Sequence, residues 1–154
     1  MLGLMQSQPL LISSLIDFAE RHHGDAEIVS RRVEGDIHRY TWRHVAARAR
    51  QVANALDGLS TGFGERVATL AWNGYRHLEL YFGVSGSGRV LHTINPRLHP
   101  EQVVWIANHA EDQVLCFDMS FLPIIQAVHA RCSTVKTWVA LCDADKLPAD
   151  SGIP

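Results

Sequence analysis

Four short apolar runs lie between Arg66 and Cys142, and they decide the fold: VATLAW at 67–72, VLHTI at 90–94, VLCF at 114–117 and WVALC at 138–142. Each run is too short for a helix and is rich in β-branched or aromatic residues, which is typical of strands. None of the runs alternates apolar with polar residues, so we expect both faces of the resulting sheet to be covered.

Segments with helical spacing separate these runs. The apolar positions are Leu78, Tyr81, Phe82 and Val84 in the first segment, Val103, Ile106, Ala107 and Ala110 in the second, and Phe121, Ile124, Ile125 and Val128 in the third. Connections of this length join parallel strands. The predicted fold class is therefore α/β, with a mainly parallel sheet and helices on both faces. Two alternative folds are excluded. A bundle of four core helices and an all-β sandwich both disagree with the short lengths of the runs and with the helical spacing between them.

Residues 1–60 predict a helix, a hairpin and a second helix that lead into this sheet. An apolar stripe favours a helix from Pro9 to Gly24, with Gly24 as the left-handed residue after its end. Strand-like runs at 27–31 and 37–40 are joined by a turn at Gly35, which favours a hairpin.

Thr41 is expected to cap the second helix, which ends at Gly58. A loop over 59–64 then enters the sheet region 66–142, and residues 143–154 have the composition of a linker. We therefore expect one domain over 1–154.

The composition of the chain argues against several classes of protein. The chain has 154 residues and a net charge of −2, so no electrostatic argument favours nucleic acid or an anionic membrane as partner. It has no apolar run long enough for a transmembrane helix, and its start lacks the basic region of a signal peptide. The three cysteines are odd in number, and Cys116 and Cys142 fall in predicted buried strands, which favours reduced thiols and a cytoplasmic location.

The cluster GVSGSG at 83–88 suggests a phosphate loop, because glycine clusters cradle phosphates. A phosphate loop leaves a strand and opens a helix, whose amino end carries free N–H groups and positive partial charge. These glycines instead follow a predicted helix and precede a strand, where carbonyl groups face outward. We interpret them as a helix stop with close helix–strand packing.

Nine histidines suggest a metal site, but they are scattered and no pair has the spacing of a known metal motif. His92 differs from the others because it lies inside a predicted buried strand, where its ring needs a hydrogen-bond partner. We interpret it as a satisfied core histidine. Three arginines on the second helix, Arg43, Arg48 and Arg50, are interpreted as a solvated face, with an anion site as the alternative.

Several segments resemble the opening of the adenylate-forming acyl-CoA ligases. FAERH at 18–22 and RYTWRHV at 39–45 are similar to the region of the first core motif, of type L-[TS]-Y-x-E-L, with His44 in place of the glutamate that would complete a capping box. GERVATL at 64–70 resembles the family's G-D-R-V-A run, and 84–95 resembles its second core motif. RHLELYF at 76–82, LHTINPRL at 91–98 and NHAED at 108–112 are similar to medium- and long-chain fatty acyl-CoA synthetases.

This resemblance implies an AMP-forming ligase that joins a fatty acid to CoA through an acyl-adenylate, using ATP, CoA and Mg²⁺, and that forms a homodimer through its N-terminal part. It also implies that the phosphate loop, the ATP-binding aspartate, the hinge and the catalytic lysine lie beyond these 154 residues. We accordingly assign no catalytic, cofactor-binding or metal-binding residue here.

The leading hypothesis is thus an N-terminal ligase segment that is inactive alone. The alternative is a stand-alone α/β interaction module without ligase chemistry. A flavodoxin-like nucleotide binder is disfavoured because no strand-to-helix turn is rich in glycine.

Overall fold

The fold is known from a computed structural model that describes residues 3–4, 6–59 and 61–153. Met1, Leu2, Met5, Pro154 and Ser60 of the predicted loop 59–64 lie outside the described residues. The elements are α1 (Ile12–His23), β1 (Glu27–Arg31), β2 (Ile37–Thr41), α2 (Trp42–Gly58), β3 (Arg66–Leu70), α3 (Tyr75–Gly86), β4 (Val90–Thr93), α4 (Pro100–Ala110), β5 (Asp112–Asp118), α5 (Leu122–Val128) and β6 (Thr137–Leu141), with short 3₁₀ turns around α5 and after β6.

The predicted parallel sheet is confirmed. Its four strands have the order β4-β3-β5-β6, and all three neighbouring pairs are parallel. The predicted hairpin is also confirmed, since β1 and β2 pair antiparallel as a separate two-stranded sheet. Gly35 has a φ of 100° in the hairpin turn, a conformation that glycine adopts without the strain a side chain would add.

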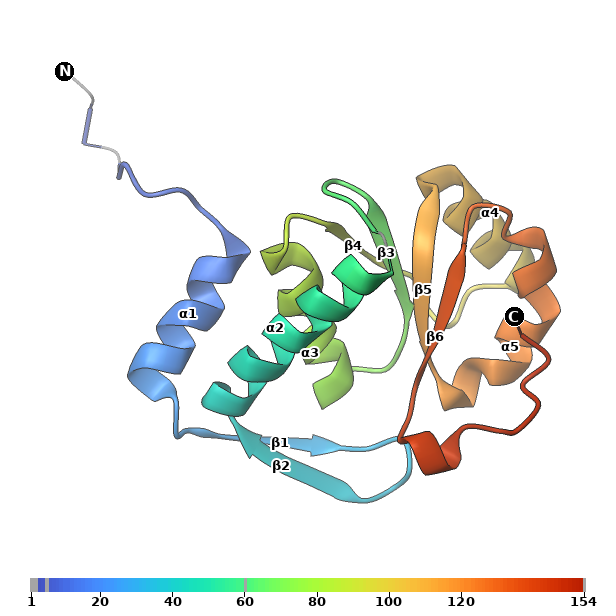
Figure 1. The fold of residues 1–154 in the computed structure, drawn as a ribbon, viewed down its shortest axis with the longest axis horizontal. Coiled ribbons are helices and arrows are strands. Elements are labelled where there is room, and N and C mark those ends of the chain that lie inside the picture. Colours follow the sequence, from blue (N-terminus) through green and yellow to red (C-terminus); the bar gives the residue numbers. More distant parts are fainter. Residues whose placement is uncertain (1–2, 5, 60, 154) are drawn as a thin grey trace.

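Helices cover both faces of the sheet (Figure 1). Leu56 of α2 and Leu80 and Val84 of α3 pack with Val67 of β3 on one face. On the other face Val103 and Ala107 of α4 and Ile125 of α5 pack with Leu115 of β5. The central strands β3 and β5 are buried over nearly their whole length.

The edge strands depart from the expectation of two covered faces. Every residue of β6 is half-buried, and β4 has exposed residues at both ends. An edge strand has a neighbour on one side alone, so its side chains have fewer partners to pack against. Cys142 follows β6 rather than lying in it and is half-buried, whereas Cys116 is buried as predicted.

Some local predictions about the helices were wrong. α1 begins at Ile12 rather than Pro9, and Gly24 has a right-handed φ of −53°. The face of α3 toward the sheet carries Leu80 and Val84, while Tyr81 is largely exposed. Helical spacing identifies an apolar face, but only packing against a second surface decides which of two neighbouring faces is buried.

Thr41 is the N-cap of α2, as predicted. The sequence has His44 where a capping box usually has a glutamate, but the structure shows that the capping box is formed nevertheless. The backbone N–H of Thr41 donates to Nδ1 of His44 at 3.3 Å. An unprotonated ring nitrogen accepts a hydrogen bond as a carboxylate does, so His44 takes the role of the missing glutamate.

Candidate binding site at the carboxyl edge of the sheet

The carboxyl ends of β3 and β5 lie side by side at the centre of the sheet. The chain leaves β3 toward α3 on one face and leaves β5 toward α5 on the other. In open α/β sheets ligands bind where neighbouring connections diverge in this way. This edge is therefore the expected place for a site.

Trp72, which follows β3, is hydrogen-bonded to the end of β5. Its backbone N–H donates to Oδ2 of Asp118 at 2.7 Å, and its indole N–H donates to Ser120 Oγ at 2.9 Å. Burial raises the pKa of Asp118, although the hydrogen bond from Trp72 opposes that shift. The carboxylate thus joins β5 to the loop after β3.

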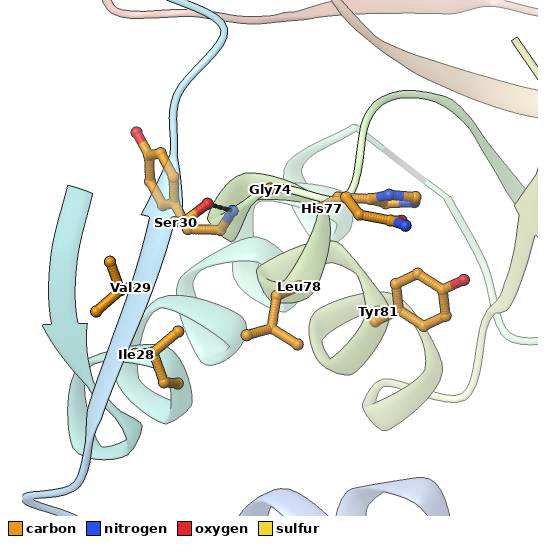
Figure 2. Close-up of a pocket in the computed structure, with 9 residues that line it drawn as sticks. Ile28, Val29, Ser30, Gly74, His77, Leu78 and Tyr81 are labelled. Atoms are coloured by element: carbon orange, nitrogen blue, oxygen red, sulfur yellow. Dashed lines mark hydrogen bonds between the residues drawn. The ribbon is translucent and has the colours of Figure 1, made fainter. Parts of the chain in front are cut away.

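A groove of about 250 Å³ lies next to this point, between β1 and the first turns of α3 (Figure 2). Its lining is mostly apolar and consists of Ile28, Val29, Ser30, Asn73, Gly74, Tyr75, His77, Leu78 and Tyr81. Gly74 precedes α3 and has no side chain to cap it, so Ser30 Oγ of β1 accepts from the backbone N–H of Tyr75 at 3.0 Å instead.

His77 lies between the groove and the core. Its Nε2 is 2.9 Å from the hydroxyl of the buried Thr69, and its ring is almost fully buried. Burial lowers the pKa of His77, because a charged imidazole loses hydration there. The ring is therefore neutral at pH 7, and it provides no positive charge for an anionic ligand.

The cations near this edge are already paired. Arg76 contacts Glu34 at 2.9 Å and Asp143 at 3.0 Å, and Arg32 also binds Asp143. The guanidinium of Arg76 lowers the pKa of Glu34 to about 2. This cluster ties the hairpin to α3 and to the segment after β6, and its charges are compensated internally, which disfavours a triphosphate at this position.

The glycine cluster lies at the opposite end of α3, as the sequence predicted. Gly88 forms the stop with a φ of 78°. Gly83, however, packs on a helix rather than on a strand, because an added Cβ would lie 2.7 Å from the carbonyl oxygen of Ala49 and from Val52 in α2. The structure thus agrees with a packing role for these glycines and corrects the predicted partner.

His92 finds its partner in Asp112 of β5, with Nδ1 at 2.9 Å and 3.0 Å from the two carboxylate oxygens. Asp112 is fully buried. β3 separates the two strands, and the methyl group of Ala68, which lies opposite His92 in the register, leaves room for the contact. The sequence predicted a partner, but its identity depends on the strand order.

The prediction that the three arginines of α2 form a solvated face holds for two of them. Arg43 and Arg50 pair with the acids Asp25 and Glu20 on the surface. Arg48 instead reaches Glu79 of α3 at 2.6 Å, and that carboxylate is buried. Nothing in the sequence indicated this pair, because the predicted apolar positions of α3 do not include Glu79 and its partner lies on a different helix.

Among the described residues, no group of three His, Cys, Asp or Glu side chains is placed to hold a metal ion. Of the helices in the described ranges, none has the length and apolar character needed to cross a membrane.

Residues 16–152 match the sequence model of the AMP-binding enzyme family. The chain belongs to this family. The chain is 51% identical over 149 residues to the 3-methylmercaptopropionyl-CoA ligase of Ruegeria pomeroyi, covering 97% of the chain and 28% of that protein. It is 47% identical to the medium-chain-fatty-acid–CoA ligase of Ectopseudomonas oleovorans, covering 92% of the chain and 26% of that protein.

The solved structure of an anthranilate CoA ligase in complex with anthranoyl-AMP contains the same fold as this chain. The TM-score is 0.74 with 27% identity, over 89% of the chain and 27% of that structure. The chain thus spans about a quarter of the length of the curated relatives it matches.

Proposed function

We propose that this chain is the N-terminal segment of an ATP-dependent acyl-CoA ligase that acts on a linear aliphatic acid of medium or long chain length. The observation that carries the proposal is the identity of 51% over nearly the whole chain to a CoA ligase of which the matched residues make up 28%. A second relative acts on medium-chain fatty acids, and a third, 47% identical over 131 residues, on long-chain ones.

The proposed reaction has two steps. A carboxylate oxygen of the acid attacks the α-phosphorus of ATP, which forms acyl-AMP and breaks the bond to pyrophosphate. The CoA thiolate then attacks the acyl carbonyl carbon, and AMP leaves. Mg²⁺ and preorganised N–H donors would stabilise the charge on the phosphoryl oxygens.

We propose that residues 1–154 do not carry out this reaction alone and contain no catalytic, cofactor-binding or metal-binding residue. The glycine cluster lies at the carboxyl end of α3, where the helix dipole repels anions. The arginines at the carboxyl edge of the sheet are paired with acids. In this proposal 1–60 and 66–142 form one scaffold domain, and 143–154 leads to the remainder of the ligase.

We propose that the segment also contributes to a homodimer through α1. The apolar stripe of the first helix predicts a contact at Leu11, Ile12, Leu15 and Ile16. Leu11, Ile12 and Leu15 are exposed, as is Phe18, whereas Ile16 is buried inside the chain and does not contribute. Apolar patches of this kind favour association. A cytoplasmic location completes the proposal, and the three free cysteines fit its reducing conditions.

Pyrophosphate exchange tests the proposal. The reading frame extended past Pro154 should exchange pyrophosphate into ATP with octanoate or palmitate and far less with acetate. Residues 1–154 alone should give no exchange and no heat of ATP binding in calorimetry. Exchange by the 154 residues would disprove their inactivity, and an extended chain without exchange would favour the stand-alone interaction module.

A further inference from the structure

The hairpin contacts the start of α3 at Tyr75, beside the ion pair of Glu34 with Arg76. We call the contact at Tyr75 the hairpin–α3 seam and define it by Ser30, His38, Tyr40 and Tyr75. Ser30 accepts from the Tyr75 backbone N–H at 3.0 Å, and the Tyr40 hydroxyl donates to the Tyr75 carbonyl at 3.4 Å. The ring of His38 stacks on that of Tyr75 with centroids 3.8 Å apart and an angle of 19°. The His38–Tyr75 stack is thus the closest aromatic contact in the seam, since the rings of Tyr40 and Tyr75 are 5.8 Å apart.

The seam is important for the hairpin because β1 and β2 form a sheet of their own, with no ladder to the four-stranded sheet. A two-stranded hairpin in water is marginally stable unless it packs on another element. The hairpin therefore depends on contacts such as the Tyr75 stack, whereas the parallel sheet has its own core on both faces.

His38 is placed in the seam as a neutral ring. Its Nε2 is buried and has no hydrogen-bond partner among the residues that the structure describes. The neutral ring with its proton on Nδ1 leaves Nε2 as an unused acceptor, but a protonated ring would place an N–H donor there without an acceptor. A buried donor without a partner loses its hydration without compensation, so protonation disfavours the docked hairpin.

Charged side chains around His38 shift its pKa in both directions. Arg48 of α2, Arg76 of α3 and Arg32 after β1 disfavour a positive ring, while Glu79 of α3 favours it. Glu79 is already bound to Arg48 at 2.6 Å, so its carboxylate is largely compensated. Burial is the main cause that lowers the pKa of His38 below its ordinary value, and the three guanidinium groups add to it.

We propose that His38 is a proton-sensitive latch: its neutral ring holds the hairpin on Tyr75, and proton uptake by the ring releases the hairpin while the parallel sheet stays folded. Because β1 forms one wall of the 250 Å³ groove, release of the hairpin opens that groove (Figure 2). This inference does not depend on the ligase proposal.

Thermodynamic linkage sets the direction in which pH changes the stability of the docked hairpin. The docked state binds the proton more weakly than the released state, whose pKa is about 6.5. Docking is thus fully stabilised above that pH and weakens as the pH falls below it. For a single proton, release becomes up to about tenfold more favourable per pH unit until the pKa of docked His38 is passed.

Hydrogen exchange measured by mass spectrometry tests the latch on the 154-residue chain between pH 7.5 and 5.0, with rates corrected for intrinsic exchange. Protection of peptides covering β1 and β2 should fall up to about tenfold per pH unit below 6.5, while peptides of β3 and β5 keep theirs. An equal loss in all strands, or no loss in the hairpin, would overturn the proposal.

A matched pair of variants assigns the effect to His38. His38→Phe keeps an aromatic ring on Tyr75 without a titrating group and should abolish the pH dependence, while His109→Phe, at an exposed histidine of α4, should retain it. An unchanged pH dependence in His38→Phe would contradict the latch. If His38→Phe does not fold, the NMR titration of His38 in the unaltered chain must share its midpoint with the loss of hairpin protection, and two separate midpoints would also overturn it.

Discussion

Gly83 of α3 lies so close to Val52 of α2 that an added Cβ would be 2.7 Å from the valine side chain. The same Cβ would be 2.7 Å from the carbonyl oxygen of Ala49, which is part of the helix backbone and has little room to move. The two helices thus approach each other at a position that glycine allows.

Gly83→Ala should therefore lower the free energy of unfolding by about 1–3 kcal/mol, the usual cost of overpacking a core. Gly86→Ala is the matched control in the same helix, because its Cβ would meet nothing closer than Ser13 at 3.8 Å. That change should be neutral or stabilise by up to about 1 kcal/mol through helix propensity. Urea denaturation followed by circular dichroism measures both, and equal effects would exclude close packing as the reason for Gly83.

The Glu34–Arg76 pair predicts a pH dependence of stability at acid pH. The pKa of Glu34 is lowered to about 2 in the folded chain, mainly by its hydrogen bond to Arg76. A lowered carboxylate pKa contributes stability that is present above the unfolded value of about 4.3 and is lost as the pH falls toward 2. Glu34→Gln should therefore cost about 1–2 kcal/mol at pH 7 and much less at pH 2.5.

The control for Glu34 is Glu27→Gln, which removes an exposed pair with Arg39. Exposed pairs contribute about 0–1 kcal/mol, so this variant should change little at either pH. The interpretation fails if Glu34→Gln costs the same at pH 7 and pH 2.5, since the charge of Glu34 would then be irrelevant.

The contact between His92 and Asp112 predicts a penalty for removing the histidine. His92→Phe keeps a planar ring but leaves the fully buried carboxylate of Asp112 without its donor. An unpaired buried polar group costs about 1–3 kcal/mol, and more when it is charged. Thermal and urea denaturation should both show this loss, whereas His109→Phe on the exposed side of α4 should stay within about 0.5 kcal/mol. Similar values for the two variants would rule out a structural role for the pair.

The exposed face of α1 predicts the site of self-association. Leu15 is 63% exposed on this face, and Leu15→Asp should shift a dimer toward monomer in light scattering, because a carboxylate would be desolvated in the contact. Trp105→Asp is the control, since Trp105 is 64% exposed on α4 and should leave association unchanged. A monomer at high concentration in the unaltered chain would disprove the proposed dimer.

The sequence by itself determined the class of fold and the order of elements. The runs at 67–72, 90–94, 114–117 and 138–142 were short, β-branched and separated by helical spacing, and those local properties suffice to predict parallel strands with helical connections. The glycine cluster could likewise be assigned to a helix end from its order in the chain, because a helix has chemically different ends.

Only the tertiary structure decided which distant residues meet. The strand order β4-β3-β5-β6 places Asp112 within reach of His92, and the crossing of α2 with α3 brings Arg48 to Glu79. The hairpin's position on Tyr75 creates both the groove and the unpartnered nitrogen of His38. Local spacing determines what each segment becomes, whereas these contacts depend on how completed elements pack, and packing is a property of the whole chain.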